Sequence, residues 1–243
     1  EELKDGEDLT LDKRLIFIHR QLAIMNQKMQ EFGSTLSTFY GKPLEIWKQI
    51  LEQYPIKTVY TNHDYEPYAI DRDDQVQQLL SAKGIDFKTF KDQVIFEKSE
   101  VVKADGKPYT VFTPFSRRWK EKFYQNELEF YPSENLLQVL FKTKFQEIIS
   151  LEEMEFQEDK DLDFPSLNVN TKTIEQYQEN RDFPYLENST SKLGVHLRFG
   201  TISIRKAVQI ALDNKSETYL NEIIWREFYM VILWQLPHVV HST

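Results

Sequence analysis

The sequence of 243 residues contains no cysteine. This absence excludes disulfide bonds, a thiol nucleophile, and zinc or iron–sulfur sites with thiolate ligands. The chain also has no Gly-x-Gly-x-x-Gly or Walker A loop, and no Gly-x-Ser-x-Gly elbow. Standard dinucleotide and NTP sites and serine hydrolases are therefore disfavoured. None of the five histidines forms a pair with the helical spacing of a zinc site, so we expect no metal.

Long apolar runs are lacking as well. The longest such run follows Glu227 and reaches only about half of the ~18 residues that suggest a membrane span. No charged and apolar leader of the secretory type is present, which predicts a cytoplasmic protein without a membrane partner. The net charge of −9 argues against a simple electrostatic DNA binder but leaves room for a local basic groove. The basic residues within 117–122 are most simply the solvated face of a helix.

Alternating hydrophobic patterns predict an α/β organisation in the first part of the chain. Apolar residues recur every three or four positions between residues 11 and 32, which predicts a helix ended by Gly33. Further predicted helices begin at Pro43 and Pro67. Predicted strands or extended segments cover residues 35–40, 57–61, 86–90 and 94–96. This alternation predicts a parallel sheet with helices on its faces, although a first strand before residue 10 is lacking.

The pattern of predicted helices and strands changes twice along the chain. We expect an α/β, Rossmann-like domain over residues 1–125, a connector over 126–170 and a wholly helical part over 171–243. An acidic run at 152–163 is interpreted as an exposed part of the connector. The chain has no initiating methionine and stops just after a strongly apolar helix, so we expect a fragment that lacks both ends.

The most informative segment is the predicted helix over residues 221–236. It is apolar almost all round, yet its first half carries Glu222, Arg226 and Glu227. One interpretation is an i, i+4 ion pair between Glu222 and Arg226. The other is a ligand site, because the aromatic residues interspersed with these charges suit a planar, polar ligand. Upstream, the hydroxyl residues 189–191 either bind phosphate or are a plain helix cap. Residues 200–203 are interpreted as a loop and cap that open a helix at Ile204.

Several segments together are more specific than any one alone. In the C-terminal half these segments are Tyr177 with residues 181–184, then residues 190–194, 197–203 and 221–228. In the N-terminal half they are residues 62–67 with Arg72-Asp73, and residues 109–115. In order and spacing they resemble the photolyase/cryptochrome family, and the resemblance runs from about residue 10 to the end. It implies an α/β antenna domain followed by the first part of an all-α FAD-binding domain.

The resemblance also implies a function. A photolyase repairs cyclobutane pyrimidine dimers in UV-damaged DNA with an electron from light-excited reduced FAD, acting here as a monomer. The alternative within the family is a cryptochrome, a blue-light photoreceptor without repair activity. Glu222 followed by Trp225 favours repair, since these residues face the lesion in the family. A third interpretation, from another class, is an α/β interaction domain with a helical tail and no flavin.

Residue roles are implied position by position. Glu222 would be catalytic and would contact the dimer together with Trp225, Arg226 and Tyr229. The expected FAD contacts are Tyr177, Thr190, Ser191, Lys192, Leu193, Gly194, Tyr219 and Arg226. Tyr68-Ala69 stands where folate-binding members of the family carry Asn-Glu. The resemblance therefore argues against a folate antenna and leaves the identity of a second chromophore open.

Overall fold

The computed structural model describes residues 10–183 and 185–241. The chain folds into two compact units, one made of residues up to Ile46 with Tyr131–Pro165, and the other of Trp47–Phe130 with Ser166 onward. The two units are described separately. The predicted boundaries at residues 125 and 170 differ from this division, so the proposed domains stay a prediction.

Helix α1 (Lys13–Glu31) is the main element of the first unit. It begins where the Asp12 carboxylate accepts a hydrogen bond from the backbone N–H of Arg14, at 2.8 Å. Gly33, with φ of 68°, follows its end as predicted. Ile16 of α1 packs against Leu151 and Met154 in a small apolar cluster. The 3₁₀ helices of this unit are η1 (Ser133–Val139) and η2 (Glu152–Met154). Part of the acidic run is thus packed on α1 rather than fully exposed.

The predicted strand at residues 35–40 is wrong. In the described part of the chain this segment pairs with no other strand, and its hydrogen bonds join backbone to side chains instead. The buried Asn26 Oδ1 accepts from Leu36 N–H at 2.7 Å, and the backbone N–H of Ile149 donates to Thr38 Oγ1 at 2.9 Å. An alternating sequence favours extended backbone, but it cannot supply a partner strand.

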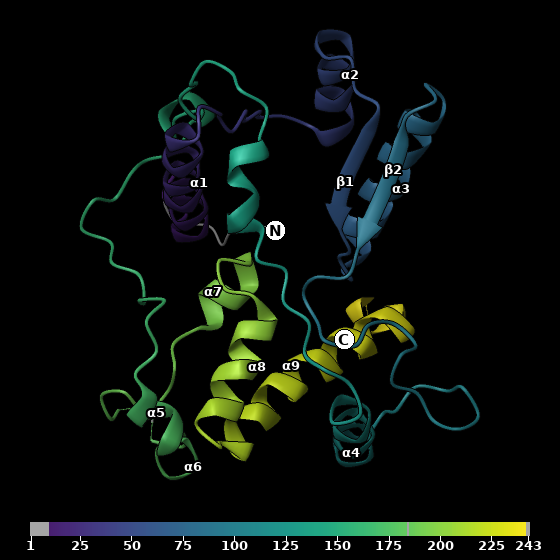
Figure 1. Cartoon of the computed structure of the whole chain (residues 1–243), viewed down its shortest axis with the longest axis vertical. Coiled ribbons are helices and arrows are strands. Elements are labelled where there is room, and N and C mark those ends of the chain that lie inside the picture. Colours follow the sequence, from purple (N-terminus) through teal and green to yellow (C-terminus); the bar gives the residue numbers. More distant parts are fainter. Residues whose placement is uncertain (1–9, 184, 242–243) are drawn as a thin grey trace. The chain divides into compact units, whose positions relative to one another are not determined.

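The second unit begins with a small α/β part. Strand β1 (Thr58–Asn62) pairs in parallel with β2 (Asp86–Phe90) (Figure 1). In this pairing Val59 lies opposite Phe87. Helices α2 (Pro43–Gln53) and α3 (Pro67–Ser81) contribute to the core under the sheet, where Val59, Val76 and Leu80 are buried. The predicted helix starts and the two strands are confirmed. The segment at 94–96 joins no strand of the described residues.

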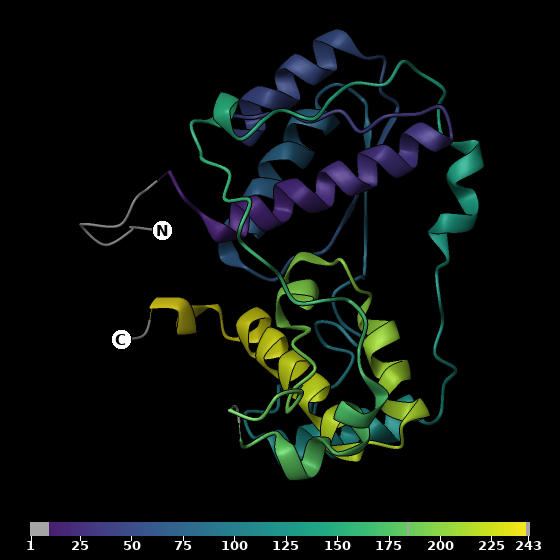
Figure 2. The ribbon, with the colours of Figure 1, turned by 90° about the vertical axis from the view of Figure 1, so that its left-hand side faces the viewer.

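The rest of this unit is helical in the described residues beyond Thr171, as predicted. Its elements are α4 (Phe112–Phe123), α5 (Thr171–Glu175), α6 (Tyr177–Asn180), α7 (Gly194–Phe199), α8 (Ile204–Asp213), α9 (Glu217–Gln235) and η3 (Pro237–His241). Helices α4, α8 and α9 share one apolar core (Figures 1 and 2). Ser203 caps α8 by accepting from Arg205 N–H at 3.2 Å, as expected. No helix in the described residues has the length and hydropathy of a membrane span.

Candidate functional site

The predicted site residues of α9 lie on one stripe of that helix. Glu222, Trp225, Arg226 and Tyr229 are spaced i, i+3, i+4 and i+7, which puts them on one face. The opposite side of α9 is buried in the apolar core through residues such as Ile223 and Ile224. The core therefore fixes the helix and presents this stripe at its partly exposed face.

Glu222 pairs with Arg181, not with Arg226. The Arg181 guanidinium contacts the Glu222 carboxylate, and both side chains are about one-third exposed, at 35% and 37%. The neighbouring negative charge of Glu222 is the main cause of a raised pKa at Arg181. The i, i+4 pair within α9, one of the two interpretations of the sequence, is thus replaced by a contact to the residue that follows α6. Arg181 has no role in the sequence-based site, and only its place in the family motif could have indicated one.

Two tyrosines, Tyr219 buried and Tyr177 half-buried, lie beside this pair. The rings of Tyr177 and Tyr219 meet edge to face at 5.1 Å, and Tyr219 is also hydrogen-bonded to the Ser191 side chain. Burial is the largest cause of a raised pKa at both phenols, so they stay neutral at physiological pH. The structure therefore brings together three predicted cofactor residues from separate parts of the sequence.

Thr190 and Ser191 lie just before a helix rather than at its first residue. Helix α7 begins at Gly194, and the Ser191 Oγ accepts from Leu193 N–H at 3.4 Å. Lys192 has a φ of 53°, in the left-handed region. In the described residues, the backbone N–H groups of Thr190, Ser191 and Lys192 donate to no protein acceptor. Successive free N–H groups beside two hydroxyls suit an anionic oxygen such as that of a phosphate.

Trp225 is held in an aromatic stack. Its ring lies parallel to that of Phe112, with a centroid distance of 3.7 Å and an interplanar angle of 7°. Tyr229, one turn further along α9, stacks on it at 5.5 Å and is itself 62% exposed. Phe228 meets the indole edge to face at 5.7 Å. The indole is half-buried and has a defined orientation, with an exposed tyrosine next to it.

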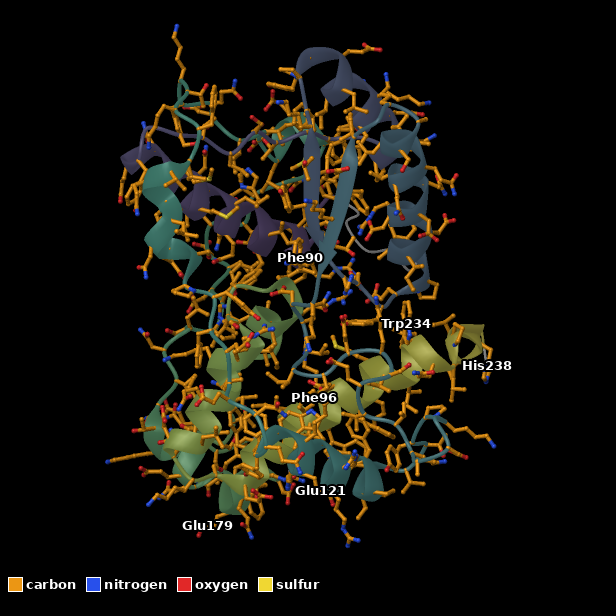
Figure 3. The ribbon with its side chains drawn as sticks, turned by 45° about the vertical axis from the view of Figure 1, so that its right-hand side comes forward. Phe90, Phe96, Glu121, Glu179, Trp234 and His238 are labelled. Carbon is orange, nitrogen blue, oxygen red and sulfur yellow. The ribbon has the colours of Figure 1, made fainter. Side chains whose placement is uncertain are left out.

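Arg226 and Glu227 fasten α9 to the segment that follows β2. Arg226 donates to the carbonyl of Gln93 at 2.6 Å and to that of Leu197 at 3.1 Å, and desolvation lowers its pKa. The Glu227 carboxylate, 1% exposed, accepts N–H bonds from Ile95, Phe96 and Trp119. Figure 3 shows Phe96 beside α9. Arg226 thus has a structural contact, and its contact with a ligand phosphate stays a prediction.

A model of a known family matches more than half of the chain. It is described as DNA photolyase, and residues 4–133 match it.

The chain belongs to the DNA photolyase family.

Named photolyases agree with this assignment over nearly the whole chain. A deoxyribodipyrimidine photo-lyase of Synechococcus is 29% identical over 252 residues, covering 92% of this chain and 51% of the relative. One from Halobacterium salinarum is 27% identical over 249 residues, covering 93% and 51%. A (6-4) DNA photolyase of Arabidopsis thaliana is 24% identical over 253 residues, covering 93% and 46%. This photolyase-family chain spans about half the length of the curated relatives it matches.

Solved structures confirm the photolyase fold. A class III photolyase from Agrobacterium tumefaciens aligns with a TM-score of 0.75 at 22% identity, covering 99% of this chain and 53% of that one. A Synechocystis cryptochrome aligns with a TM-score of 0.72 at 18% identity, covering 92% and 51%. An archaeal photolyase from Sulfolobus tokodaii, solved with two FAD molecules, aligns with a TM-score of 0.66 at 21% identity, covering 93% and 49%. The predicted family and the mixed α/β fold with a helical part are confirmed, while the residue roles stay predictions.

Proposed function

We propose that the full-length protein containing this chain is a flavin-dependent, light-driven DNA repair enzyme that splits cyclobutane pyrimidine dimers. The observation that carries the proposal is the placement of Glu222 and Trp225 one turn apart on the partly exposed face of α9. A carboxylate can hydrogen-bond the polar edge of a base while a flat aromatic ring packs against the base. A pyrimidine dimer is already poorly stacked, so flipping it out of the duplex toward such a face costs less than flipping a normal base.

The residues near α7 suit FAD, which the family implies. The free N–H groups and hydroxyls at Thr190 and Ser191 offer donors to the phosphates, and the segment up to Gly194 would hold the ribityl chain. Tyr219 and Tyr177 provide neutral, mostly apolar surface beside it. When bound in its reduced form, FAD supplies the electron for dimer splitting after it absorbs blue light.

The protein supplies positioning and electrostatics in this proposal. Arg181 orients the Glu222 carboxylate through the ion pair between the two side chains. Glu222 would then bind the dimer and stabilise the added electron through a hydrogen bond. Trp225 and Tyr229 would pack against the lesion, and Arg226 would add a cationic group near flavin or DNA phosphate.

A cryptochrome-type photoreceptor without repair is the second candidate. It is favoured by the fold similarity to the Synechocystis cryptochrome. Repair of an oligonucleotide with a single cyclobutane dimer, under blue light and in the dark, separates the two candidates. Light-dependent repair supports a photolyase, whereas its absence in a flavin-loaded protein supports a cryptochrome. Repair of a (6-4) lesion instead would keep the class of enzyme and change the substrate.

Glu222→Gln tests the role of the carboxylate directly. The amide keeps the shape and one acceptor but removes the charge, so we expect repair per absorbed photon to fall about three- to tenfold. Flavin occupancy and folding should be nearly intact. Glu217→Gln is the matched control, because Glu217 is also an ion-paired carboxylate of α9, with Lys120 as its partner. If Glu222→Gln unfolds much of the protein while the folded fraction repairs normally, the Arg181–Glu222 pair is structural and the catalytic role is wrong.

The cofactor identities need a separate measurement. We expect the absorption spectrum of the purified full-length protein to show a flavin band, and an additional band if a second antenna chromophore is bound. The monomeric state, the cytoplasmic location and the identity of that chromophore remain predictions.

A further inference from the structure

Phe112 belongs to no predicted site, yet it makes the tightest aromatic contact of Trp225. It is the first residue of α4 and lies more than a hundred positions before Trp225 in the sequence. Their rings are parallel within 7° at a centroid distance of 3.7 Å, which puts the phenyl ring in van der Waals contact with one face of the indole. The phenyl ring occupies that side of the indole, so the Trp225 side chain cannot rotate toward it and its orientation is restricted.

The surroundings of Phe112 fix this ring in turn. Phe112 meets Phe228 edge to face at 6.0 Å, and Phe228 is buried in the core shared by α4 and α9. Phe228 also contacts the Trp225 indole edge to face. Phe112, Trp225 and Phe228 therefore form a closed triangle of ring contacts, in which α4 determines where a side chain of α9 points. Tyr229 adds an exposed ring to the same stack.

We infer that Phe112 is a positioning residue for recognition of damaged DNA. It acts by covering one face of Trp225 and leaving the rest of the indole, with Tyr229, for the flipped lesion. This inference rests on the proposed contact between Trp225 and the lesion. A side chain that is ordered before binding loses less conformational freedom when the ligand arrives, which strengthens binding. Undamaged DNA, bound mainly through its phosphates, gains nothing from this arrangement.

The test compares the binding of two labelled oligonucleotides to the full-length, flavin-loaded protein. One carries a single cyclobutane thymine dimer, and the other has the same sequence without damage. Fluorescence anisotropy gives the ratio of the two dissociation constants. Phe112→Leu should lower this discrimination about three- to tenfold, the factor expected for one aromatic contact. Phe112→Tyr keeps the stack and should restore it.

The chain offers a matched control at the other end of α4. Phe123 stacks on Trp119 at 4.8 Å with an interplanar angle of 15°, so Phe123→Leu removes the same kind of contact from the same helix. Trp119 is fully buried and bonds Glu227, away from the exposed stripe of α9. Phe123→Leu should therefore lower stability without lowering discrimination. Equal losses of discrimination in the two leucine variants would overturn the inference, because they would reflect a general loosening of α4.

A second readout follows the indole itself. With 5-fluorotryptophan incorporated, the Trp225 signal in the ¹⁹F NMR spectrum is assigned by its loss in Trp225→Phe. Phe112→Leu should shift this signal, since the ring current of the stacked phenyl group disappears, and Phe112→Tyr should leave it near its original position. An unshifted signal in Phe112→Leu would overturn the inference.

Failure of the inference and failure of the proposed function give different results. If Trp225→Ala leaves discrimination unchanged, Trp225 does not read the lesion, and the proposed contact fails together with the inference that rests on it. If Trp225→Ala lowers discrimination and Phe112→Leu does not, the proposed contact holds and only the positioning role of Phe112 is wrong. Both the proposed contact and the positioning role are supported if Trp225→Ala and Phe112→Leu lower discrimination between damaged and undamaged DNA. Phe112→Tyr should then restore discrimination, and Phe123→Leu should leave it unchanged.

Discussion

Arg226 and Glu227 are adjacent, oppositely charged residues of α9, and both form hydrogen bonds with the backbone of residues 93–96. Arg226 donates to the carbonyl of Gln93, and Glu227 accepts from the N–H groups of Ile95 and Phe96. Buried charges are tolerated where hydrogen bonds of this kind replace the lost water. The two residues look like part of a ligand site in the sequence, but in the structure both have protein partners. They hold in place the helix that carries Glu222 and Trp225.

Glu227→Gln should destabilise the protein because the Glu227 side chain accepts hydrogen bonds from three N–H groups. Its Oε1 accepts from Phe96 and Trp119 and its Oε2 from Ile95, at 2.9, 2.6 and 2.6 Å. At pH 5 the carboxyl group is protonated, but its hydroxyl oxygen can still accept from an N–H donor, whereas the NH₂ group of an amide cannot. We therefore expect a loss of about 1–3 kcal/mol in the free energy of unfolding at pH 5. Chemical denaturation measures this loss. Glu121→Gln is the control, since Glu121 is an exposed carboxylate of α4 and should change little.

The same carboxylate predicts a pH dependence. Burial raises the pKa of Glu227 to about 7 from its usual 4.5, although its three N–H bonds act in the opposite direction. The folded protein then binds a proton that the unfolded chain has lost, so the contribution is complete below pH 4.5 and is lost as pH rises through 7. The free energy of unfolding should fall by about 2–3 kcal/mol between pH 5 and pH 8 on this account. Glu227→Gln should flatten this slope, and an unchanged slope would show that other groups cause it.

At the scale of elements, the short turn before α7 decides whether residues 190–194 are a binding segment or a plain cap. Three successive N–H groups there have no protein acceptor in the described residues, whereas Ser203 is an ordinary cap of α8. Replacing Thr190 and Ser191 together with alanine should lower flavin occupancy after purification, because two proposed donors to the flavin are lost. Ser203→Ala should cost about 1 kcal/mol of stability and leave occupancy unchanged. If the double variant retains its flavin fully, Thr190 and Ser191 are plain caps.

Helices whose ends are marked by a proline or a glycine could be predicted from the sequence. A strand, which needs a partner from a distant part of the chain, was predicted wrongly at residues 35–40. Helices α2 and α3 begin at the predicted prolines, and Gly33 follows α1, because these residues set backbone angles by themselves. The segment at 35–40 has the alternation of a strand but takes its hydrogen bonds from Asn26 and from the backbone near residue 149. Nothing local in the sequence distinguishes such a segment from a paired strand.

At the scale of the whole molecule, the candidate site illustrates the same limit. Family resemblance singled out Tyr177, Ser191 and Tyr219 as cofactor residues, and the fold brings these three side chains together. Their contact with a cofactor stays a prediction. The local i, i+4 rule offered Arg226 as one partner of Glu222, whereas the fold brings in Arg181 from 41 positions away. Burial of Glu227 against Trp119, 108 positions apart, could not be read from the sequence either.

The two compact units also depend on residues that lie far apart in the sequence. Residues 131–165 belong to the first unit although the chain on either side of them belongs to the second. Arg20 of α1 makes several of the contacts that hold them. Its guanidinium binds the Glu158 carboxylate and the carbonyls of Asp159 and Leu162, and it lies 5.5 Å from the centre of the Phe164 ring. An acidic segment that resembles a free connector is thus held by one cation through several bonds.

Arg20→Ala should release this segment without disturbing the second unit. Loss of the ion pair and of the bonds to two carbonyls should lower the local opening free energy by about 1–3 kcal/mol. Amide hydrogen exchange followed by mass spectrometry should therefore speed up at residues 157–164 and stay unchanged in α9. Lys28→Ala, which removes an exposed cation from the last turn of α1, is the control and should alter neither region. Faster exchange in α9 as well would contradict this prediction and show that the two units open together.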